Sequence, residues 1–345
     1  MRILITGHTG FVGIWLGTYL SRLGHELYGY SLPPRATSLF ASDTRFLGVF
    51  KENYFGRIQQ REEFVEFAQK VQPEIIFHLA AQAIVKTAKE DQWNTYETNV
   101  MGTISVMECA DRVDSIKSVV LITTDKVYKQ NSERISFTEE AELFSKEPYG
   151  ASKVAAEQVI QAYYSNLDKP KFAYAIARAG NIVGAGDDGE ARLIPYLIMC
   201  ASTNTTVVLR HPTATRPWTY ILDITNGYWK LAKHIDGKKG YLGAWNFGTN
   251  PSGRLTVLET TNLIMQELEI PKPNVKNSPE TFYEQEFLEL SSLKSFRELS
   301  WRPKFSAEQA VKTAAKNHFR FVKIGNFNAV TECLEEYEIR EEQSD

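Results

Sequence analysis

Three features that would place this sequence in other classes of protein are missing. It has no apolar run long enough to cross a bilayer, and residues 3–5 are too few for the apolar region of a signal peptide. Lys and Arg number 39 against 42 Asp and Glu, so the net charge of -3 gives no basic excess for a nucleic-acid partner. Cys109, Cys200 and Cys333 show neither pairing nor metal-ligand spacing. We therefore expect a cytoplasmic protein with reduced thiols, no membrane span and no metal.

The chain opens on a short apolar strand that runs into a glycine-rich turn. Gly7, Gly10 and Gly13 follow residues 2–5, and a helical pattern continues to Leu23. A short apolar run suits a parallel strand that is covered on both faces. Glycines at this spacing allow backbone N–H groups to approach a pyrophosphate at the positive end of the next helix. Glycines also mark ordinary turns, but the strand before them and the helix after them predict a dinucleotide site.

Strands and helices alternate through the first half of the chain. Strands are expected at 2–5, 26–30, 54–58, 75–81, 119–123 and 173–178, and helices at 62–71, 93–112 and 149–164. This alternation predicts an α/β fold with a doubly wound parallel sheet of the Rossmann type, whose ligands bind at the carboxyl ends of the strands.

The second half is less regular. Helices are expected at 193–200 and 224–234, a strand at 244–247, a loop at 209–218, a proline-rich connector at 271–279 and a solvated acidic helix from 331. We expect an NAD-binding domain at 1–180 with a returning segment at 219–248, a smaller, interleaved substrate lobe at 181–218 and 249–330, and an acidic tail at 331–345.

An acid that commonly binds the ribose of NAD is missing. The strand at 26–30 continues into Ser31-Leu32-Pro33-Pro34, which offers no carboxylate for the ribose hydroxyls. No arginine follows immediately, so a pocket for a 2′-phosphate is not evident either.

Tyr149 and Lys153 lie one helical turn apart at the start of the helix expected at 149–164. A phenol with a pKa near 10 is a poor base at neutral pH, and a nearby ammonium stabilises its ionised form. Such a tyrosine can take a proton from an alcohol whose carbon gives up a hydride, and Thr124 would bind the same alcohol. The pair could also be two ordinary helix residues, but the upstream glycine turn favours the catalytic interpretation.

These motifs resemble the extended short-chain dehydrogenase/reductase superfamily, the NAD-dependent epimerases and dehydratases. The resemblance covers nearly the whole chain, and its motifs are Gly7-x-x-Gly10-x-x-Gly13, His78-Leu79-Ala80-Ala81, Tyr149-x-x-x-Lys153 and Ala179-Gly180-Asn181. Within the superfamily, residues 6–11, 124–126, 177–181, 192–195, 214–218 and 245–248 are most similar to the nucleotide-sugar 4,6-dehydratases that act on CDP-glucose. The resemblance implies NAD as cofactor, a nucleotide-sugar substrate with CDP-glucose favoured, and a homodimer or homotetramer packed through helices 93–112 and 149–164.

The implied reaction moves a hydride from sugar C4 to NAD+, removes water across C5 and C6, and returns the hydride to C6. Asp125 would be the acid for the departing hydroxyl. Lys126 stands where dehydratases of other nucleotide sugars carry Glu, and its role is open between base and enolate stabiliser. Alternatively, Asp125 and Lys126 only form a polar loop at the end of a strand. Because the cofactor begins and ends the cycle oxidised, NAD is favoured over NADP.

The resemblance also implies a set of site residues. The catalytic candidates are Thr124, Asp125, Lys126, Tyr149 and Lys153. The cofactor-binding candidates are Gly7, Thr9, Gly10, Phe11, Val12, Gly13, Arg57, Ile58, Leu79, Ala80, Ala81, Thr123, Tyr149 and Lys153. The substrate-binding candidates are Gln82, Asn181, Arg192, Leu193, Pro195, Arg210 and Arg216, of which Arg216 is the best candidate for the pyrophosphate. His78 is expected to be a buried histidine with its hydrogen bonds satisfied.

Some residues depart from the dehydratase pattern and leave other functions open. Val12 replaces a lysine, Arg57 replaces an aspartate, and residues 83–89 differ near the expected sugar site. The alternatives are another nucleotide-sugar dehydratase, a 4-epimerase, or a non-catalytic NAD-binding sensor. Asp125 and Lys126 argue against the epimerase, and a sensor has no need of Thr124 together with the Tyr-Lys pair.

Overall fold

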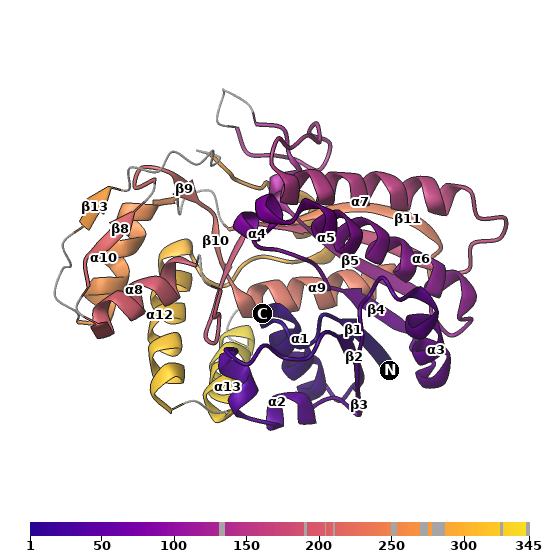
Figure 1. Ribbon diagram of the computed structural model, residues 1–345, viewed down its shortest axis with the longest axis horizontal. Helices are drawn as coiled ribbons and strands as arrows, with labels where there is room; N and C mark the ends of the chain where they lie inside the picture. The colour runs from indigo at the N-terminus through magenta and orange to yellow at the C-terminus, as the bar shows by residue number, and fades with distance from the viewer. Residues whose placement is uncertain are drawn as a thin grey trace.

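A seven-stranded parallel sheet forms the centre of the molecule (Figure 1). The computed structural model describes residues 1–130, 135–189, 192–203, 205–209, 211–249, 254–269, 275–277, 287–324 and 327–342. The strands are β1 (Arg2–Thr6), β2 (Glu26–Ser31), β3 (Glu52–Phe55), β4 (Ile75–His78), β5 (Ser118–Thr124), β6 (Ala173–Ala179) and β11 (Gly240–Phe247). Their order, β11-β6-β5-β4-β1-β2-β3, confirms the predicted doubly wound fold.

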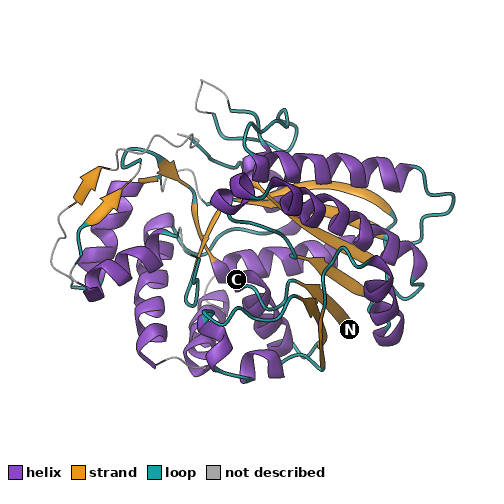
Figure 2. Cartoon of the chain, in the orientation of Figure 1, coloured by secondary structure: helices purple, strands orange, loops and turns teal. Residues whose placement is uncertain are grey.

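Helices cover both faces of this sheet (Figure 2). Side chains alternate between the faces of a strand, so Ile3 and Ile5 join one buried cluster while Leu4 joins the other. The first cluster includes residues of α1 (Phe11–Arg22) and α9 (Ile221–Ile235), and the second includes residues of α3 (Arg61–Val71), α6 (Gly102–Arg112) and α7 (Pro148–Ser165).

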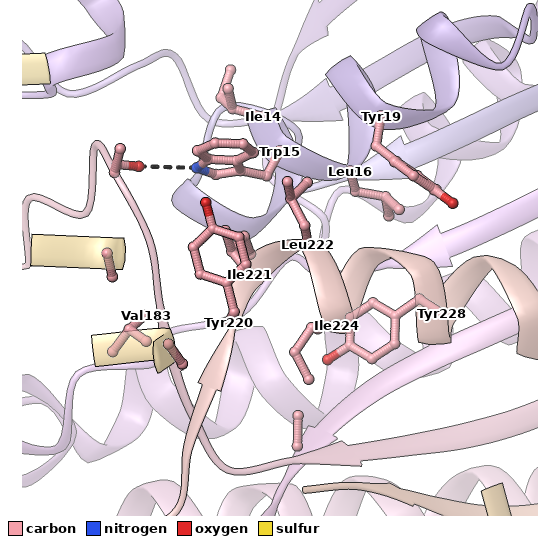
Figure 3. Packing of buried hydrophobic residues seen from close by; sticks show 14 of the residues in the cluster. Ile14, Trp15, Leu16, Tyr19, Val183, Tyr220, Ile221, Leu222, Ile224 and Tyr228 are labelled. Atoms are coloured by element: carbon pink, nitrogen blue, oxygen red, sulfur yellow. Dashed lines mark hydrogen bonds between the residues drawn. The ribbon is translucent and has the colours of Figure 1, made fainter. Parts of the chain in front are cut away.

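Trp15 packs at the centre of the first cluster. Figure 3 shows its indole among Ile14, Ile221 and Leu222. The indole Nε1 donates a hydrogen bond of 2.9 Å to the carbonyl of Ala185. This hydrogen bond connects α1 to the loop that follows β7 (Asn181–Val183).

The helix expected at 93–112 is divided by a π-helical turn. The segments are α5 (Gln92–Tyr96), the π turn Glu97–Met101 and α6. Asn99 lies in this turn, fully buried. Its side chain accepts a 2.8 Å bond from the N–H of Gln82, donates to the carbonyl of Gln82 (3.0 Å) and donates to Ser152 Oγ (2.8 Å). The wider turn therefore directs a polar side chain between the β4 loop and α7, a common use of π turns near functional sites.

The second half of the chain adds short strands and helices beside the sheet. They are β7, α8 (Leu193–Thr203), β8 (Val207–Leu209), β9 (Thr215–Arg216), β10 (Trp218–Tyr220), β12 (Leu255–Thr256), α10 (Val257–Glu267), β13 (Val275–Asn277), α11 (Leu293–Leu299) and α12 (Ala307–Ile324). Of these, α11 packs against α9 and β11. The short helices α2 (Arg45–Gly48) and α4 (Val85–Glu90) lie in loops of the first half. The strands pair two by two: β10 with β7, β12 with β9 and β13 with β8.

Two sequence-based expectations for this half are corrected. The loop expected at 209–218 contains β9, a strand of two residues that fits between Pro212 and Pro217. The connector expected at 271–279 contains β13, and its remaining residues lie outside the described part of the chain. Pairing with strands distant in the sequence produces both elements, and local patterns do not report such pairing.

The acidic C-terminal segment is not a wholly solvated helix. It belongs to α13 (Phe327–Glu342), which buries Val330, Leu334 and Tyr337 along one face. The spacing of these residues gives an apolar stripe, and the acidic residues occupy the rest of the surface. Tyr337 Oη donates a 2.9 Å hydrogen bond to Asp223 Oδ1 of α9. Among the described residues, no helix is long and apolar enough to span a membrane.

Candidate active site

Thr124 and Asp125 lie at the carboxyl end of β5, near the middle of the sheet. Thr124 ends the strand, and residues 125–127 form a single 3-10 turn. Thr124 Oγ1 donates to Asp125 Oδ1 (3.1 Å) and accepts from the N–H of Lys126 (3.4 Å). The threonine thereby fixes the direction in which the chain leaves the sheet.

Tyr149 is positioned by the first turn of α7. Pro148 begins the helix, where the absence of an N–H has no cost. Glu147 is the N-cap, and its carboxylate accepts hydrogen bonds from the N–H groups of Tyr149 (3.0 Å) and Gly150 (2.7 Å). Glu147 was not among the predicted site residues, although an acid directly before a proline-initiated helix is a recognisable capping signal.

The side chains of Tyr149 and Lys153 are both buried, and the Tyr149 phenol is hydrogen-bonded to Thr124. Burial raises the pKa of Tyr149 to about 12, while a hydrogen bond to Thr124 and the charge of Arg192 act in the opposite direction. Burial lowers the pKa of Lys153 to about 8, against the negative charge of Glu157. Lys153 Nζ donates to the carbonyl of Ile122 in β5 (3.1 Å). The resting pair is therefore a neutral phenol next to a lysine that titrates close to neutral pH.

Asp125 has an unusual environment for a carboxylate. It is 3 % exposed, and its Oδ2 has no hydrogen-bond partner among the described residues. Burial raises its pKa, and the nearby charges of Lys126 and Arg216 oppose the shift. A side chain at Gly180 would place its Cβ 3.1 Å from Asp125 Oδ2 and 2.9 Å from Pro217 Cγ. Gly180, directly after β6, therefore approaches both the carboxyl group and Pro217 closely.

The glycine turn has the geometry that a pyrophosphate requires. Gly7 adopts a φ of 72°, and a Cβ there would lie 2.7 Å from the N of Ala80. A Cβ at Gly13 would lie 2.3 Å from the carbonyl oxygen of Gly7. Gly10 is the N-cap of α1 and offers no side chain to the helix, so the N–H groups of the first turn are available to an anion. The residues present thus fit a dinucleotide.

The remaining cofactor candidates surround this turn. Phe11 and Val12 begin α1, and Leu79, Ala80 and Ala81 follow β4. Thr9 links the glycine turn to the end of β2: its Oγ1 donates to the carbonyl of Leu32 (3.0 Å) and lies 2.9 Å from Ser31 Oγ. The end of β2 thus meets the glycine turn through hydroxyl groups rather than a carboxylate.

Arg57 and Ile58 follow β3, which ends earlier than expected, at Phe55. Ile58 is buried, and a Cβ on Gly102 would meet its Cγ2 at 2.5 Å. Arg57 is exposed, donates to Asn94 Oδ1 (3.1 Å) and pairs with Glu97 (3.7 Å).

His78 is a structural residue, as predicted. Its Nδ1 lies 2.8 Å from Thr6 Oγ1, and its Nε2 lies 3.0 Å from Thr103 Oγ1. Burial and the charge of Lys153 lower its pKa to about 3, so the ring stays neutral at physiological pH.

The substrate candidates divide into two groups. Asn181 begins β7 and pairs with Trp218 of β10. Leu193 and Pro195 lie in the first turn of α8. Arg192 precedes this helix, and its Nε lies 3.8 Å from Asp187 Oδ2. Arg216 is 6 % exposed, and its Nη1 donates to the carbonyl of Thr215 (2.8 Å). The charges of Arg192 and Arg216 act on Tyr149 and Asp125, so these two arginines converge on the catalytic candidates.

Gln82 lies in the loop after β4, and Asn99 links its backbone to Ser152 of α7. The Gln82 side-chain amide donates to the Ile84 carbonyl and to Thr95 Oγ1, both at 3.1 Å. Arg210 lies outside the described residues. Within the described part of the chain, no cluster of three His, Cys, Asp or Glu could hold a metal ion.

Two known proteins are similar to this chain in sequence over most of its length. CDP-glucose 4,6-dehydratase of Salmonella typhimurium is 31% identical over 331 residues, which cover 93% of this chain and 91% of the relative. dTDP-glucose 4,6-dehydratase of Haemophilus influenzae is 26% identical and covers 92% of this chain and 97% of its own length.

Solved structures share the fold at low identity. The UDP-glucose 4-epimerase of Thermotoga maritima, solved with UDP-glucose, matches with a TM-score of 0.80 at 22% identity, covering 93% of this chain and 99% of its own. The dTDP-glucose 4,6-dehydratase of Bacillus anthracis, solved with NAD, matches with a TM-score of 0.76 at 23% identity, covering 92% and 96%. The model of the NAD dependent epimerase/dehydratase family matches residues 3–248, which confirms NAD as the cofactor. This chain therefore belongs to the NAD dependent epimerase/dehydratase family.

Proposed function

We propose that the protein is a nucleotide-sugar 4,6-dehydratase that converts CDP-glucose to CDP-4-keto-6-deoxyglucose. The observation that carries the proposal is the buried Asp125 carboxyl, whose Oδ2 has no partner in the described structure and which adjoins Thr124 and Tyr149. Epimerisation or simple oxidation requires no acid at this position, whereas the loss of a hydroxyl does. The similarity to the Salmonella CDP-glucose enzyme supports the same substrate.

The first step is proton removal from the C4 hydroxyl. Bound NAD supplies a hydride acceptor that later becomes the hydride donor, so the cofactor ends the cycle unchanged. Thr124 binds the C4 oxygen, and Tyr149 takes its proton. The Lys153 ammonium stabilises the phenolate that a pKa of about 12 would otherwise disfavour.

Asp125 acts in the elimination. Burial raises its pKa and favours the protonated carboxyl, so its unpartnered oxygen can donate a proton to the departing C6 hydroxyl. We assign Lys126 to the C5 step: as the base, its neutral amine takes the C5 proton, and as the stabiliser, its ammonium faces the enolate while water takes that proton.

The smaller lobe would bind the nucleotide. In this division, residues 1–180 and 219–248 hold NAD, while residues 181–218 and 249–330 hold the nucleotide. Arg216 is the candidate for the pyrophosphate because a guanidinium can donate two parallel hydrogen bonds to phosphate oxygens. Leu193 and Pro195 would contact the base.

The protein would function as a homodimer or homotetramer. Trp93, Tyr96 and Met101 are exposed along α5 and the π turn, with Trp93 81% exposed. Large apolar side chains gathered on neighbouring turns are typical of protein interfaces. Analytical ultracentrifugation would show a dimer or tetramer at micromolar concentration; a monomer would contradict the proposal.

The function is tested by product mass. The purified protein is incubated with NAD and, separately, CDP-glucose, dTDP-glucose, UDP-GlcNAc and GDP-mannose. A product of CDP-glucose lighter by one water, without accumulation of NADH, is the expected result. If only another sugar nucleotide is dehydrated, that nucleotide is the substrate instead of CDP-glucose. An isomer of unchanged mass would indicate a 4-epimerase. Cofactor binding without turnover would support the non-catalytic sensor.

A further inference from the structure

Glu157 forms a buried ion pair directly behind the catalytic candidates. It lies one helical turn after Lys153 in α7, and its side chain is 0% exposed. Arg178 of β6 donates from Nε to Oε1 (3.1 Å) and from Nη2 to Oε2 (2.6 Å). Thr123 of β5 donates to Oε1 as well (2.6 Å). Three donors thus satisfy one carboxylate in a site that excludes water.

A second layer of hydrogen bonds fixes the arginine. Arg178 Nη1 donates to Tyr128 Oη (2.8 Å) and to the Glu139 carbonyl (3.0 Å). Tyr128 Oη donates to Asn246 Oδ1 (2.7 Å), in β11. The guanidinium is charged at every accessible pH and donates to both carboxylate oxygens, which makes a bidentate ion pair.

Stability alone is a weak reason for such a pair. Replacing a buried ion pair by apolar residues of similar volume is often neutral or stabilising, because the desolvation of two charges offsets their attraction. The position of this pair supplies another reason. Lys153 and Glu157 contact consecutive residues of β5, Ile122 and Thr123, immediately before Thr124.

We propose that Glu157 is a positioning residue: its fixed negative charge keeps Lys153 protonated, and its bond to Thr123 holds the strand end that carries Thr124 and Asp125 against α7. This inference rests on the proposed function for its effect on turnover. Its effect on Lys153 is independent of which sugar nucleotide is the substrate.

The other groups that face Lys153 do not supply this charge. Tyr149 on α7 is neutral at rest, and His78 on β4 is neutral at physiological pH. Arg178 on β6 is positive and lies beyond the carboxylate, and Tyr241 on β11 faces the ion pair as a neutral phenol whose pKa burial raises to about 12. Among these groups, Glu157 alone is negative and opposes the burial that lowers the pKa of Lys153.

The direct test measures the protonation of Lys153 without substrate. Lysine labelled with ¹³C at Cε is incorporated, and the Lys153 resonance is assigned by its loss in Lys153→Met. Its titration midpoint is expected near pH 8 in the wild type. In Glu157→Gln, the proton affinity should be about tenfold weaker, one pH unit lower. An unchanged midpoint would overturn the proposal.

Turnover provides the second readout. In Glu157→Gln, kcat should fall about twofold at pH 7 and about tenfold at pH 9, which lies above both midpoints, while KM for the nucleotide sugar changes less than about twofold. Glu157→Asp, which keeps the charge, should recover part of the loss. A merely structural role would change the melting temperature and leave the lysine midpoint in place. If the wild type acts on no nucleotide sugar while the midpoint still moves, the proposed function fails and this inference stands.

Two further variants control for folding and for ion pairs in general. If Glu157→Gln does not fold because Arg178 is left unpaired, Glu157→Met with Arg178→Met removes both charges, and the midpoint should still move down; a midpoint at the wild-type value in that double variant would refute the role. Glu62→Gln breaks an exposed pair with Arg112 of similar geometry (2.9 and 3.1 Å) on α3 and α6. It should leave the midpoint and kcat at wild-type values.

Discussion

The two sides of the candidate site are built differently. On the sheet side, Thr124 and Asp125 end a central strand, and Tyr149 and Lys153 lie on a capped helix of 18 residues. On the lobe side, Arg216 ends a strand of two residues. The sheet side is held by continuous backbone ladders, and the lobe side by short paired strands. Under the proposed function, the chemistry would take place on the more rigid sheet side, and substrate recognition on the side where the sequence can vary with little effect on the sheet.

Tyr149→Phe is the most severe test of the sheet side. Removing one hydroxyl should lower turnover about 10²–10⁴-fold, because the phenol that takes the C4 proton is lost. NAD binding should persist, since the glycine turn is untouched. Stopped-flow turnover and equilibrium NAD titration measure the two effects. Activity near the wild-type level would remove Tyr149 from the mechanism.

Asp125→Asn separates the two halves of the reaction on the same side. The amide cannot donate a proton as an acid, so elimination should slow about 10²-fold while the first oxidation continues. A transient NADH absorbance at 340 nm should therefore grow. Equal slowing of both steps would argue against the acid role.

Arg216→Gln tests the lobe side. Loss of a charge-assisted contact to phosphate should raise KM for the nucleotide sugar about tenfold or more, with a smaller change in kcat. The charge of Arg216 also opposes the raised pKa of Asp125, so the variant should keep Asp125 protonated to higher pH. A change confined to kcat would place Arg216 with the chemistry rather than with recognition.

Asp223→Asn probes the junction between the two sides and should have the smallest effect. Asp223 of α9 accepts from the N–H of Lys304 (2.9 Å) and from Tyr337 of α13, and burial raises its pKa to about 6. The folded protein therefore binds more protons than the unfolded chain between about pH 4 and pH 6. Over this window the free energy of unfolding of the wild type should fall with rising pH, relative to the variant, by about 1–3 kcal/mol.

Urea denaturation at pH 4 and pH 7 measures this difference. The contrast is between the two proteins at each pH, so other titrating groups cancel. A constant difference between them would show that Asp223 does not titrate in this range.

The sheet was more predictable than the lobe. Continuous apolar runs such as residues 119–123 favour a buried parallel strand, so β5 and its neighbours could be predicted from the local pattern. The two-residue strand β9 and the buried face of α13 depend on partners far along the chain. The prediction of a solvated tail was wrong because it rested on six glutamates and overlooked the helical spacing of Val330, Leu334 and Tyr337.

The sequence alone determined the parallel sheet, the glycine turn and the Tyr-Lys pair, because each depends on residues within one strand, turn or helix. Only the tertiary structure decided that Asp125 is buried with an unpartnered oxygen and that Glu157 faces Lys153 from within an ion pair with Arg178. Charges and burial act through space, and the groups that set them come from β5, β6 and α7, which are separated in the chain by tens of residues.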